Sequence, residues 1–329
     1  MRRVLAPVLV ALGLVAVSCA DAPPTNGARQ QSDGPVIAAV GDIACNSLPS
    51  EHANRCRYDA TAEAIRGIDP DAYLALGDLQ YLHGSIEDFR SYYDHEFHDL
   101  MPITRPVPGN HETYTLYMQG YFDYFGKRAH GPGGFYSFDL GTWHLIALNS
   151  QICKGSTWNP DLGQQTPITK NRAIGEGCGP GTAMYEWAKK DLALHPAECT
   201  LAFMHHPLFG DESWPKGVFL YQLQPLWQLL DDNGVDVVLN GHVHNYERYA
   251  PQDAYGRPDP DGMVQITSGL GGSTYGDPPV PEWSPNLEAW QNTSFGVLRM
   301  TLLDGGYDYA FVTAPGEDPY TDEGHTDCV

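Results

Sequence analysis

Residues 72–81 read AYLALGDLQY, a short apolar run that ends at Gly77 and Asp78 and is followed closely by Tyr81. Runs of four to eight apolar residues bounded by Gly or Asp are typical of buried strands and too short for buried helices. Similar runs recur at 36–41, 103–108, 143–148, 200–204, 235–240, 263–267 and 295–303. The sequence therefore predicts a series of buried strands.

Helical patterns lie between these runs. They cover 59–68, 86–100, 181–194 and 221–232, and Asp59 is expected to be the N-cap of the first helix. Strands that alternate with helices predict a layered α/β fold. Residues 135–148, FYSFDLGTWHLIAL, differ because they read as two antiparallel strands around the turn Asp139-Leu140-Gly141.

The composition excludes several classes of protein. Of 329 residues, 42% are apolar and 18% are charged, which is incompatible with a disordered chain. Lys and Arg number 19 against 41 Asp and Glu, so the formal net charge is −22. Because an acidic surface repels phosphate backbones, nucleic acid is not expected as a partner.

The N-terminus has the pattern of an export signal. Met1-Arg2-Arg3 precedes an apolar run over 4–17 that is too short to span a bilayer. Residues 16–19 (AVSC) resemble a bacterial lipoprotein box, in which Cys19 would carry a lipid; an ordinary export signal cut beyond Cys19 is the alternative. We expect a signal peptide over 1–18, a flexible tether over 19–35 and one domain over 36–329. The protein would lie outside the cytoplasmic membrane, either lipid-anchored to its outer face or secreted.

The remaining cysteines support export. They are an even set, which in an exported chain indicates disulfides with 15 possible pairings. No two of them are separated by fewer than ten residues, which disfavours a compact zinc site. We favour sequential pairing: Cys45–Cys56, Cys153–Cys178 and Cys199–Cys328.

Five of the apolar runs end in polar residues that can bind metals. These are Asp42, Asp78 with Tyr81, Asn110 with His111, His205 with His206, and His242 with His244. Each fragment alone is compatible with a turn, a capped loop or a buried histidine. However, strand ends converge in an α/β sheet, so the ordered set favours one shared site. Its oxygen and nitrogen donors suit Zn, Fe or Mn.

The same set resembles a known superfamily. Gly-Asp, Gly-Asp-x-x-Tyr, Gly-Asn-His-Glu, His-x-Pro and Gly-His-x-His, in this order, resemble the calcineurin-like metallophosphoesterases. Within that superfamily, Tyr81, GHVHNYER (241–248) and FYSFDLG (135–141) resemble the purple acid phosphatases. The resemblance covers roughly 36–312 and implies a four-layer αββα sandwich with two mixed sheets.

The resemblance also implies a pair of metal ions. Asp42, Tyr81 and His244 would hold an Fe(III), and Asp78 would bridge to the second ion. Asn110, His205 and His242 would complete the second site, which would hold Fe, Zn or Mn. Many relatives place a His where this chain has Ala44, a departure consistent with Tyr81 supplying that ligand.

The implied activity is hydrolysis of small phosphate monoesters by a metal-bound hydroxide. His111, beside Asn110, is expected to be the general acid or a stabiliser of the transition state. Because residues 207–241 contain no His, His206 is the alternative proton donor. A phosphodiesterase or nucleotide phosphatase, or a non-catalytic metal- or phosphate-binding lipoprotein, stays open.

Overall fold

The computed structural model describes residues 34–49, 56–159, 162–210, 221–275 and 285–329. The predicted signal peptide lies outside the described residues, as does the predicted tether except for Gly34 and Pro35. The described residues all belong to one unit, which extends over 33–329. Among them, no helix combines the length and apolar character needed to cross a bilayer.

One large sheet has the strand order β15-β14-β13-β1-β2-β3. Its strands are β1 (Val36–Val40), β2 (Ala72–Ala75), β3 (Thr104–Pro106), β13 (Gly296–Leu303), β14 (Gly306–Thr313) and β15 (Glu323–Asp327). β1, β2 and β3 are mutually parallel, whereas β13 pairs antiparallel with β1. Every residue of β1 and β2 is buried, which explains why these strands read as unbroken apolar runs.

The other large sheet has the order β12-β10-β11-β9-β8-β5-β4. Its strands are β4 (Tyr136–Leu140), β5 (Trp143–Ala147), β8 (Cys199–Phe203), β9 (Val237–Asn240), β10 (Tyr246–Tyr249), β11 (Val264–Ser268) and β12 (Leu287–Gln291). β5, β8, β9 and β11 run parallel to one another. β4 pairs antiparallel with β5, β10 with β11, and β12 with β10. β6 (Ser156–Asn159) and β7 (Gln164–Pro167) form a separate two-stranded sheet.

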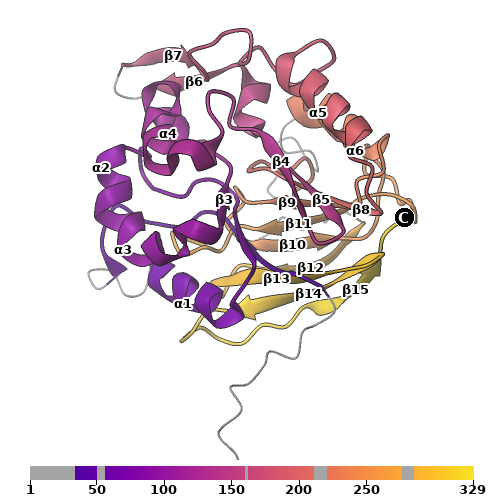
Figure 1. Ribbon diagram of the computed structural model, residues 1–329. Helices are drawn as coiled ribbons and strands as arrows, with labels where there is room; N and C mark the ends of the chain where they lie inside the picture. Colours follow the sequence, from indigo (N-terminus) through magenta and orange to yellow (C-terminus); the bar gives the residue numbers. More distant parts are fainter. Residues whose placement is uncertain (1–33, 50–55, 160–161, 211–220, 276–284) are drawn as a thin grey trace, which may run out of the picture. The chain divides into compact units, whose positions relative to one another are not determined.

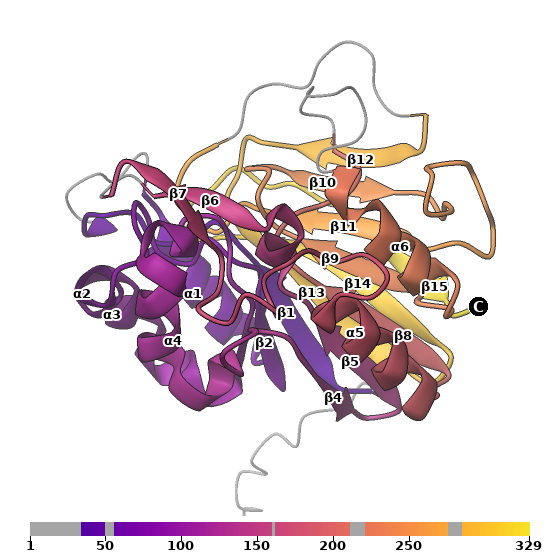
Figure 2. The same cartoon turned by 90° about the horizontal axis from the view of Figure 1, so that it is seen from above.

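Helices flank both sheets. They are α1 (Tyr58–Ile68), α2 (Ile86–Asp88), α3 (Asp94–Phe97), α4 (Gln119–Phe125), α5 (Ala183–Leu194) and α6 (Gln224–Asp231). Figures 1 and 2 show α1 to α4 gathered beside β1, β2 and β3, and α5 and α6 against the sheet that contains β5 and β8. The two sheets meet in the core, where Trp143 of β5 contacts Tyr307 of β14 edge to face at 5.8 Å between ring centroids.

This architecture confirms the predicted α/β class with two mixed sheets. Each of the eight predicted strands is present, and each of its ends lies within about three residues of the predicted end. Two details are wrong. Asp59 lies inside the first turn of α1, and Arg57 occupies the cap position without a capping side-chain hydrogen bond. The turn after β4 also lies later than predicted, because the strand continues to Leu140 and Gly141 takes the positive φ of 62°.

Three disulfides join the predicted pairs. Cys45–Cys56, Cys153–Cys178 and Cys199–Cys328 are all present, which confirms the sequential pairing. The third spans 129 residues and connects the start of β8 to the residue after β15. It therefore links one large sheet to the other.

Candidate metal centre

Three of the predicted ligands follow neighbouring parallel strands of the six-stranded sheet. Asp42 follows β1, Asp78 follows β2 and Asn110 follows β3. Val40 pairs with Ala75, and Ala75 pairs with Pro106, so the three strands end side by side. Their carboxyl ends therefore deliver the three side chains to one edge.

The other sheet supplies histidines to the same edge. His205 lies just after β8, and His242 and His244 follow β9, which pairs in parallel with β8. Tyr81 comes from the same loop as Asp78. The structure therefore brings all seven predicted ligand residues together, from two sheets and five strand ends.

The backbone bends sharply at this edge. Asp42, Asp78 and His242 all have positive φ, at 61°, 48° and 72°. A non-glycine residue in this region costs of order 1–2 kcal/mol, and such residues cluster at functional sites. Gly109 permits the close approach of the neighbouring loop, because a Cβ there would lie 2.2 Å from Asp78 Oδ1.

One group of donors surrounds Tyr81. Its hydroxyl donates to Asp42 Oδ1 at 2.9 Å and lies 2.9 Å from His244 Nε2. His244 Nε2 is also 3.3 Å from Asp42 Oδ1. Two ligands of one ion, each about 2 Å from it, lie about 3 Å apart, so these three side chains have the spacing of a shared ion.

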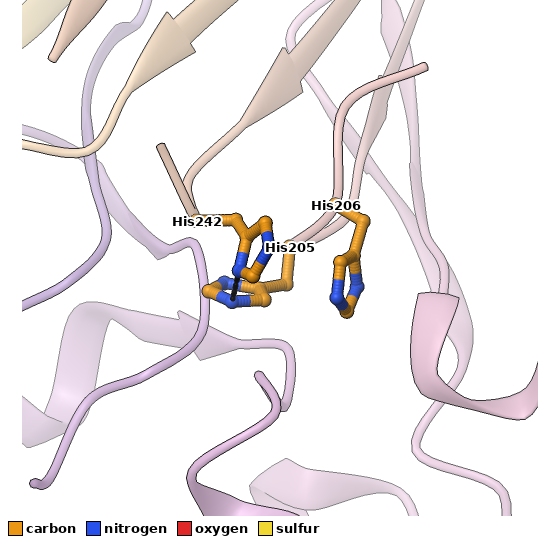
Figure 3. Close-up of side chains that lie close together, drawn as sticks. All are labelled: His205, His206 and His242. Atoms are coloured by element: carbon orange, nitrogen blue, oxygen red, sulfur yellow. Dashed lines mark hydrogen bonds between the residues drawn. The ribbon is translucent and has the colours of Figure 1, made fainter. Parts of the chain in front are cut away.

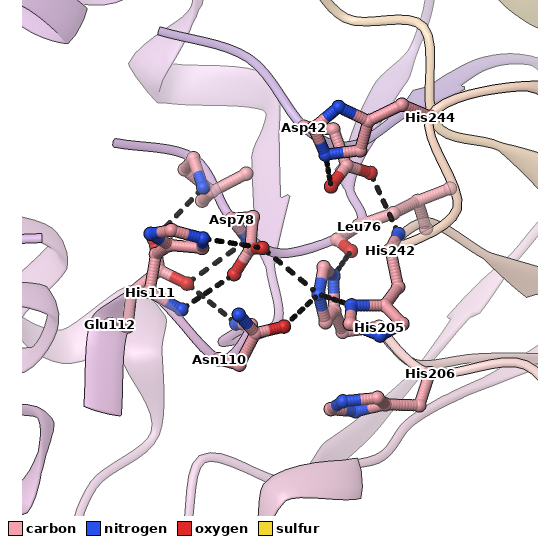
Figure 4. A network of polar contacts seen from close by, with 12 residues as sticks. Asp42, Leu76, Asp78, Asn110, His111, Glu112, His205, His206, His242 and His244 are labelled. Atoms are coloured by element: carbon pink, nitrogen blue, oxygen red, sulfur yellow. Dashed lines mark hydrogen bonds and ion pairs between the residues drawn. The ribbon is translucent and has the colours of Figure 1, made fainter. Parts of the chain in front are cut away.

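A second group surrounds His205. Its Nε2 lies 3.2 Å from Asn110 Oδ1, 3.1 Å from His242 Nδ1 and 3.3 Å from Asp78 Oδ2. Asp78 Oδ2 is also 3.3 Å from the Tyr81 hydroxyl, so Asp78 belongs to both groups. Figure 4 shows this network, with Asp42 and His244 on one side and Asn110 and His205 on the other.

The acidic and basic side chains of the candidate centre shift one another's pKa values. Burial opposes the Asp78 carboxylate, but the attraction of His205 and His111 lowers its pKa below the ordinary range. Burial also opposes charge on His205, yet Asp78 raises the pKa of that imidazole to about 9. Burial and the charges of Asp42 and Asp78 raise the pKa of Tyr81 well above its usual value. Additional positive charge among these side chains would therefore stabilise the ionised forms of the acidic groups.

A family model described as calcineurin-like phosphoesterase matches residues 35–246, which contain all seven predicted ligands. The chain belongs to the calcineurin-like phosphoesterase family. Purple acid phosphatases 22 and 18 of Arabidopsis thaliana are 26% identical to it over 271 and 295 residues. The matches cover 75% and 82% of this chain but 54% and 56% of the relatives, so the chain spans about half their length.

Solved structures share the fold of this chain. A purple acid phosphatase from yellow lupin (Lupinus luteus) seeds matches with a TM-score of 0.66 and 18% identity, over 90% of this chain and 54% of that one. A Plasmodium protein described as the anchor in the inner membrane complex matches with a TM-score of 0.61 and 15% identity. The match covers 90% of this chain and 89% of that one. At these identities the likeness establishes the fold alone.

In this calcineurin-like phosphoesterase, Glu112 joins two of the loops that carry ligands. Its carboxylate accepts backbone N–H groups from Asp78 at 3.0 Å, Leu79 at 2.8 Å and Gly109 at 2.6 Å. Burial, followed by repulsion from Asp78, raises the pKa of Glu112 to about 7, while the bond from Gly109 opposes the rise. Glu112 was part of the sequence motif, but only the structure reveals this role.

His111 and His206 occupy different environments. His111 Nδ1 donates to the Leu82 carbonyl at 2.6 Å, which leaves Nε2 3.8 Å from Asp78 Oδ2 at the wall of a cavity. His206 is fully buried, and its Nδ1 lies 2.9 Å from the Ser150 hydroxyl. Figure 3 shows His205 and His242 in direct contact, with the His206 ring beside them.

The cavity also contains residues that sequence reasoning missed. It has a volume of about 520 Å³, and its lining includes His83 and Lys154 as well as Asn110, His111 and His242. Lys154 lies in the segment that follows β5. This segment was not among the strand ends predicted to carry functional polar residues. His83 lies only two residues after Tyr81, so its proximity to the site could have been inferred.

Proposed function

We propose that this chain is an exported, binuclear metal-dependent phosphatase that hydrolyses phosphate monoesters. The observation that carries the proposal is the position of Asp78, whose Oδ2 lies 3.3 Å from both the Tyr81 hydroxyl and His205 Nε2. A carboxylate shared by two groups of donors is suited to bridge two ions. Pairs of ions about 3.5–4 Å apart are a recurrent feature of phosphatases.

The donor atoms fit such a pair. Asp42, Tyr81 and His244 offer two hard oxygens and one imidazole, a set suited to a trivalent iron. Asn110, His205 and His242 would hold the second ion, Fe, Zn or Mn. His205 Nδ1 donates to the Leu76 carbonyl at 2.8 Å, which leaves Nε2 as the coordinating nitrogen, a common arrangement for metal-binding histidines.

The two ions would supply Lewis acidity toward the phosphoryl group and an activated water as nucleophile. The protein's own groups perform the remaining tasks. His111 lies at the cavity wall with its Nδ1–H fixed by the Leu82 carbonyl, so Nε2 is positioned to give a proton to the leaving oxygen.

His206 is the weaker candidate for the proton donor. Burial lowers the pKa of His206 well below its ordinary range, which favours the uncharged imidazole over the imidazolium that a general acid requires. It does not itself line the cavity: its Nδ1 faces Ser150 and Gln151, and its ring packs against His205 and His242 at 5.0 and 4.3 Å between ring centroids. We therefore assign His206 to the support of the neighbouring ligands His205 and His242.

A substrate comparison tests the proposed reaction. The metal-loaded protein is expected to release nitrophenol from 4-nitrophenyl phosphate at least tenfold faster than from bis(4-nitrophenyl) phosphate. Preference for the diester would instead support the phosphodiesterase alternative. No turnover of either compound would favour a non-catalytic binding lipoprotein.

Export and lipid anchoring complete the proposal. Three disulfides support an oxidising compartment, and the apolar run before Cys19 supports a cleaved signal. Mass spectrometry of the membrane-associated protein should detect an acylated N-terminal Cys19. A free N-terminus beyond Cys19 would overturn the anchor and leave export standing.

A further inference from the structure

We propose that the cavity beside the metal centre is a site for an aromatic leaving group, with Lys154 binding the phosphate and Trp158 stacking on the ring. The inference rests on the proposed phosphatase function. It identifies the substrate class as phosphate monoesters that carry an aromatic ring close to the ester oxygen.

The cavity has the size and position of a substrate site. Its volume of about 520 Å³ falls in the range of roughly 300–1,000 Å³ that small-molecule pockets occupy. Asn110 and His242, two of the predicted ligands, contribute to its lining, and so does His111. A phosphoryl group held at the proposed metal centre would therefore lie next to this space.

Lys154 gives the cavity its positive charge. It is the only Lys or Arg among the described lining residues, and none of those residues is a carboxylate. Burial lowers the pKa of Lys154, and the negative charge of Asp78 opposes the decrease. An ammonium group at this position is suited to bind a phosphoryl oxygen.

Large apolar side chains face the same cavity. Trp158 is 54% exposed and Leu82 is 49% exposed, although a Trp side chain is usually well buried. Tyr114 adds a second aromatic ring to the lining. A flat aromatic group would cover this surface and gain stacking energy that an aliphatic group cannot provide.

The strand that carries Trp158 is fixed in place. The Thr113 hydroxyl donates to Thr157 Oγ1 at 3.1 Å, and the Asn159 side-chain amide donates to the Tyr114 carbonyl at 2.8 Å. Lys154 follows Cys153, which is bonded to Cys178. Because these tethers order the cavity before binding, less conformational entropy is lost when a ligand enters.

The comparison of 2-phenylethyl phosphate with ethyl phosphate tests the contribution of the aromatic ring. The alcohols that these two esters release are similarly basic, so a difference in rate is not due to leaving-group basicity. The metal-loaded wild type is expected to show a kcat/KM about tenfold higher for the phenyl ester, the effect of one aromatic contact. Trp158→Ala should remove this preference, and Trp158→Phe should retain most of it. Tyr255→Ala, at an exposed aromatic elsewhere, should leave both values unchanged.

Lys154→Gln tests the phosphate contact. It should raise KM for both esters and the inhibition constant of inorganic phosphate by about tenfold or more, as expected for loss of a charge-assisted hydrogen bond. Lys154→Arg should restore part of the loss. Metal content, measured by elemental analysis, should equal that of the wild type. An unaltered phosphate inhibition constant in Lys154→Gln would overturn this role.

Calorimetric titration with 2-phenylethylphosphonate and ethylphosphonate separates binding from turnover. The phenyl compound should bind the wild type about tenfold more tightly, and Trp158→Ala should abolish the difference. Equal values for both esters and both phosphonates would overturn the aromatic site and leave the phosphatase proposal standing. If neither ester is hydrolysed but the phosphonate difference is present, the phosphatase proposal fails and the binding site stands.

Discussion

At the scale of single residues, the centre depends on a few side chains with distinct tasks. Asp78 contacts both donor groups, Tyr81 contacts only one, and His111 faces the cavity without being assigned to either ion. Substitutions should therefore separate metal binding from turnover.

His111→Ala is expected to retain both ions and to lose about 10²- to 10⁴-fold in kcat, the usual contribution of general acid–base catalysis. Because a good leaving group needs little protonation, the loss should be smaller for 4-nitrophenyl phosphate than for ethyl phosphate. Steady-state kinetics with both esters measures the difference. Equal losses for the two esters would assign His111 to substrate positioning, and the same leaving-group dependence in His206→Ala instead would transfer the acid role.

Tyr81→Phe removes one oxygen donor and leaves the ring in place. If Tyr81 binds Fe(III), the purified protein should be coloured by a phenolate-to-iron charge-transfer band, and the variant should lose that band. Circular dichroism should match the wild type, since the phenyl ring still fills the buried position. A coloured Tyr81→Phe variant would show that another group causes the absorption.

At the scale of elements, the loops after β2 and β3 are held together by one buried carboxylate. Glu112 accepts backbone N–H groups from both loops. The positions of the predicted ligands Asp78 and Asn110 therefore depend on a residue that is not itself a predicted ligand.

Glu112→Gln would place an amide donor against backbone donors. We expect the free energy of unfolding to fall by about 1–3 kcal/mol, as for a buried donor that is left without an acceptor. Denaturant unfolding measures the change. The control is Glu186→Gln, because exposed Glu186 accepts a single backbone N–H and should cost under about 1 kcal/mol. Equal losses in the two variants would contradict the role assigned to Glu112.

The strand ends that carry the ligands could be predicted from the sequence because each follows a short, fully buried apolar run. β1 and β2 illustrate this, since every residue is buried and Gly-Asp follows within three residues. The strand β6 lacked such a signal, because its residues are mostly exposed or half-buried and polar. The cavity wall that it forms therefore became visible only in the folded chain.

At the scale of the whole molecule, the active edge lies at one end of two sheets and a disulfide lies at the other. Asp42, Asp78 and His205 follow the carboxyl ends of their strands, whereas Cys199 is the first residue of β8. Cys328 follows β15 of the other sheet, so the bond links the sheets away from the candidate metal centre.

Removing this disulfide with Cys199→Ser and Cys328→Ser should lower the free energy of unfolding by about 4–5 kcal/mol, because it closes a loop of 129 residues. The matched pair Cys45→Ser and Cys56→Ser opens a loop of 11 residues and should cost about 2 kcal/mol less. Urea denaturation of both variants provides the comparison. A smaller loss for the longer loop would contradict the expectation.

Elemental analysis of the purified, metal-reconstituted protein beside its Asp78→Ala variant tests the central claim most directly. Asp78 joins the two donor groups, so the account predicts two ions per chain in the wild type, at least one of them iron. The variant should lose metal and phosphatase activity together. A wild type that binds one ion or none after reconstitution, or an Asp78→Ala variant that retains two, would contradict the binuclear centre.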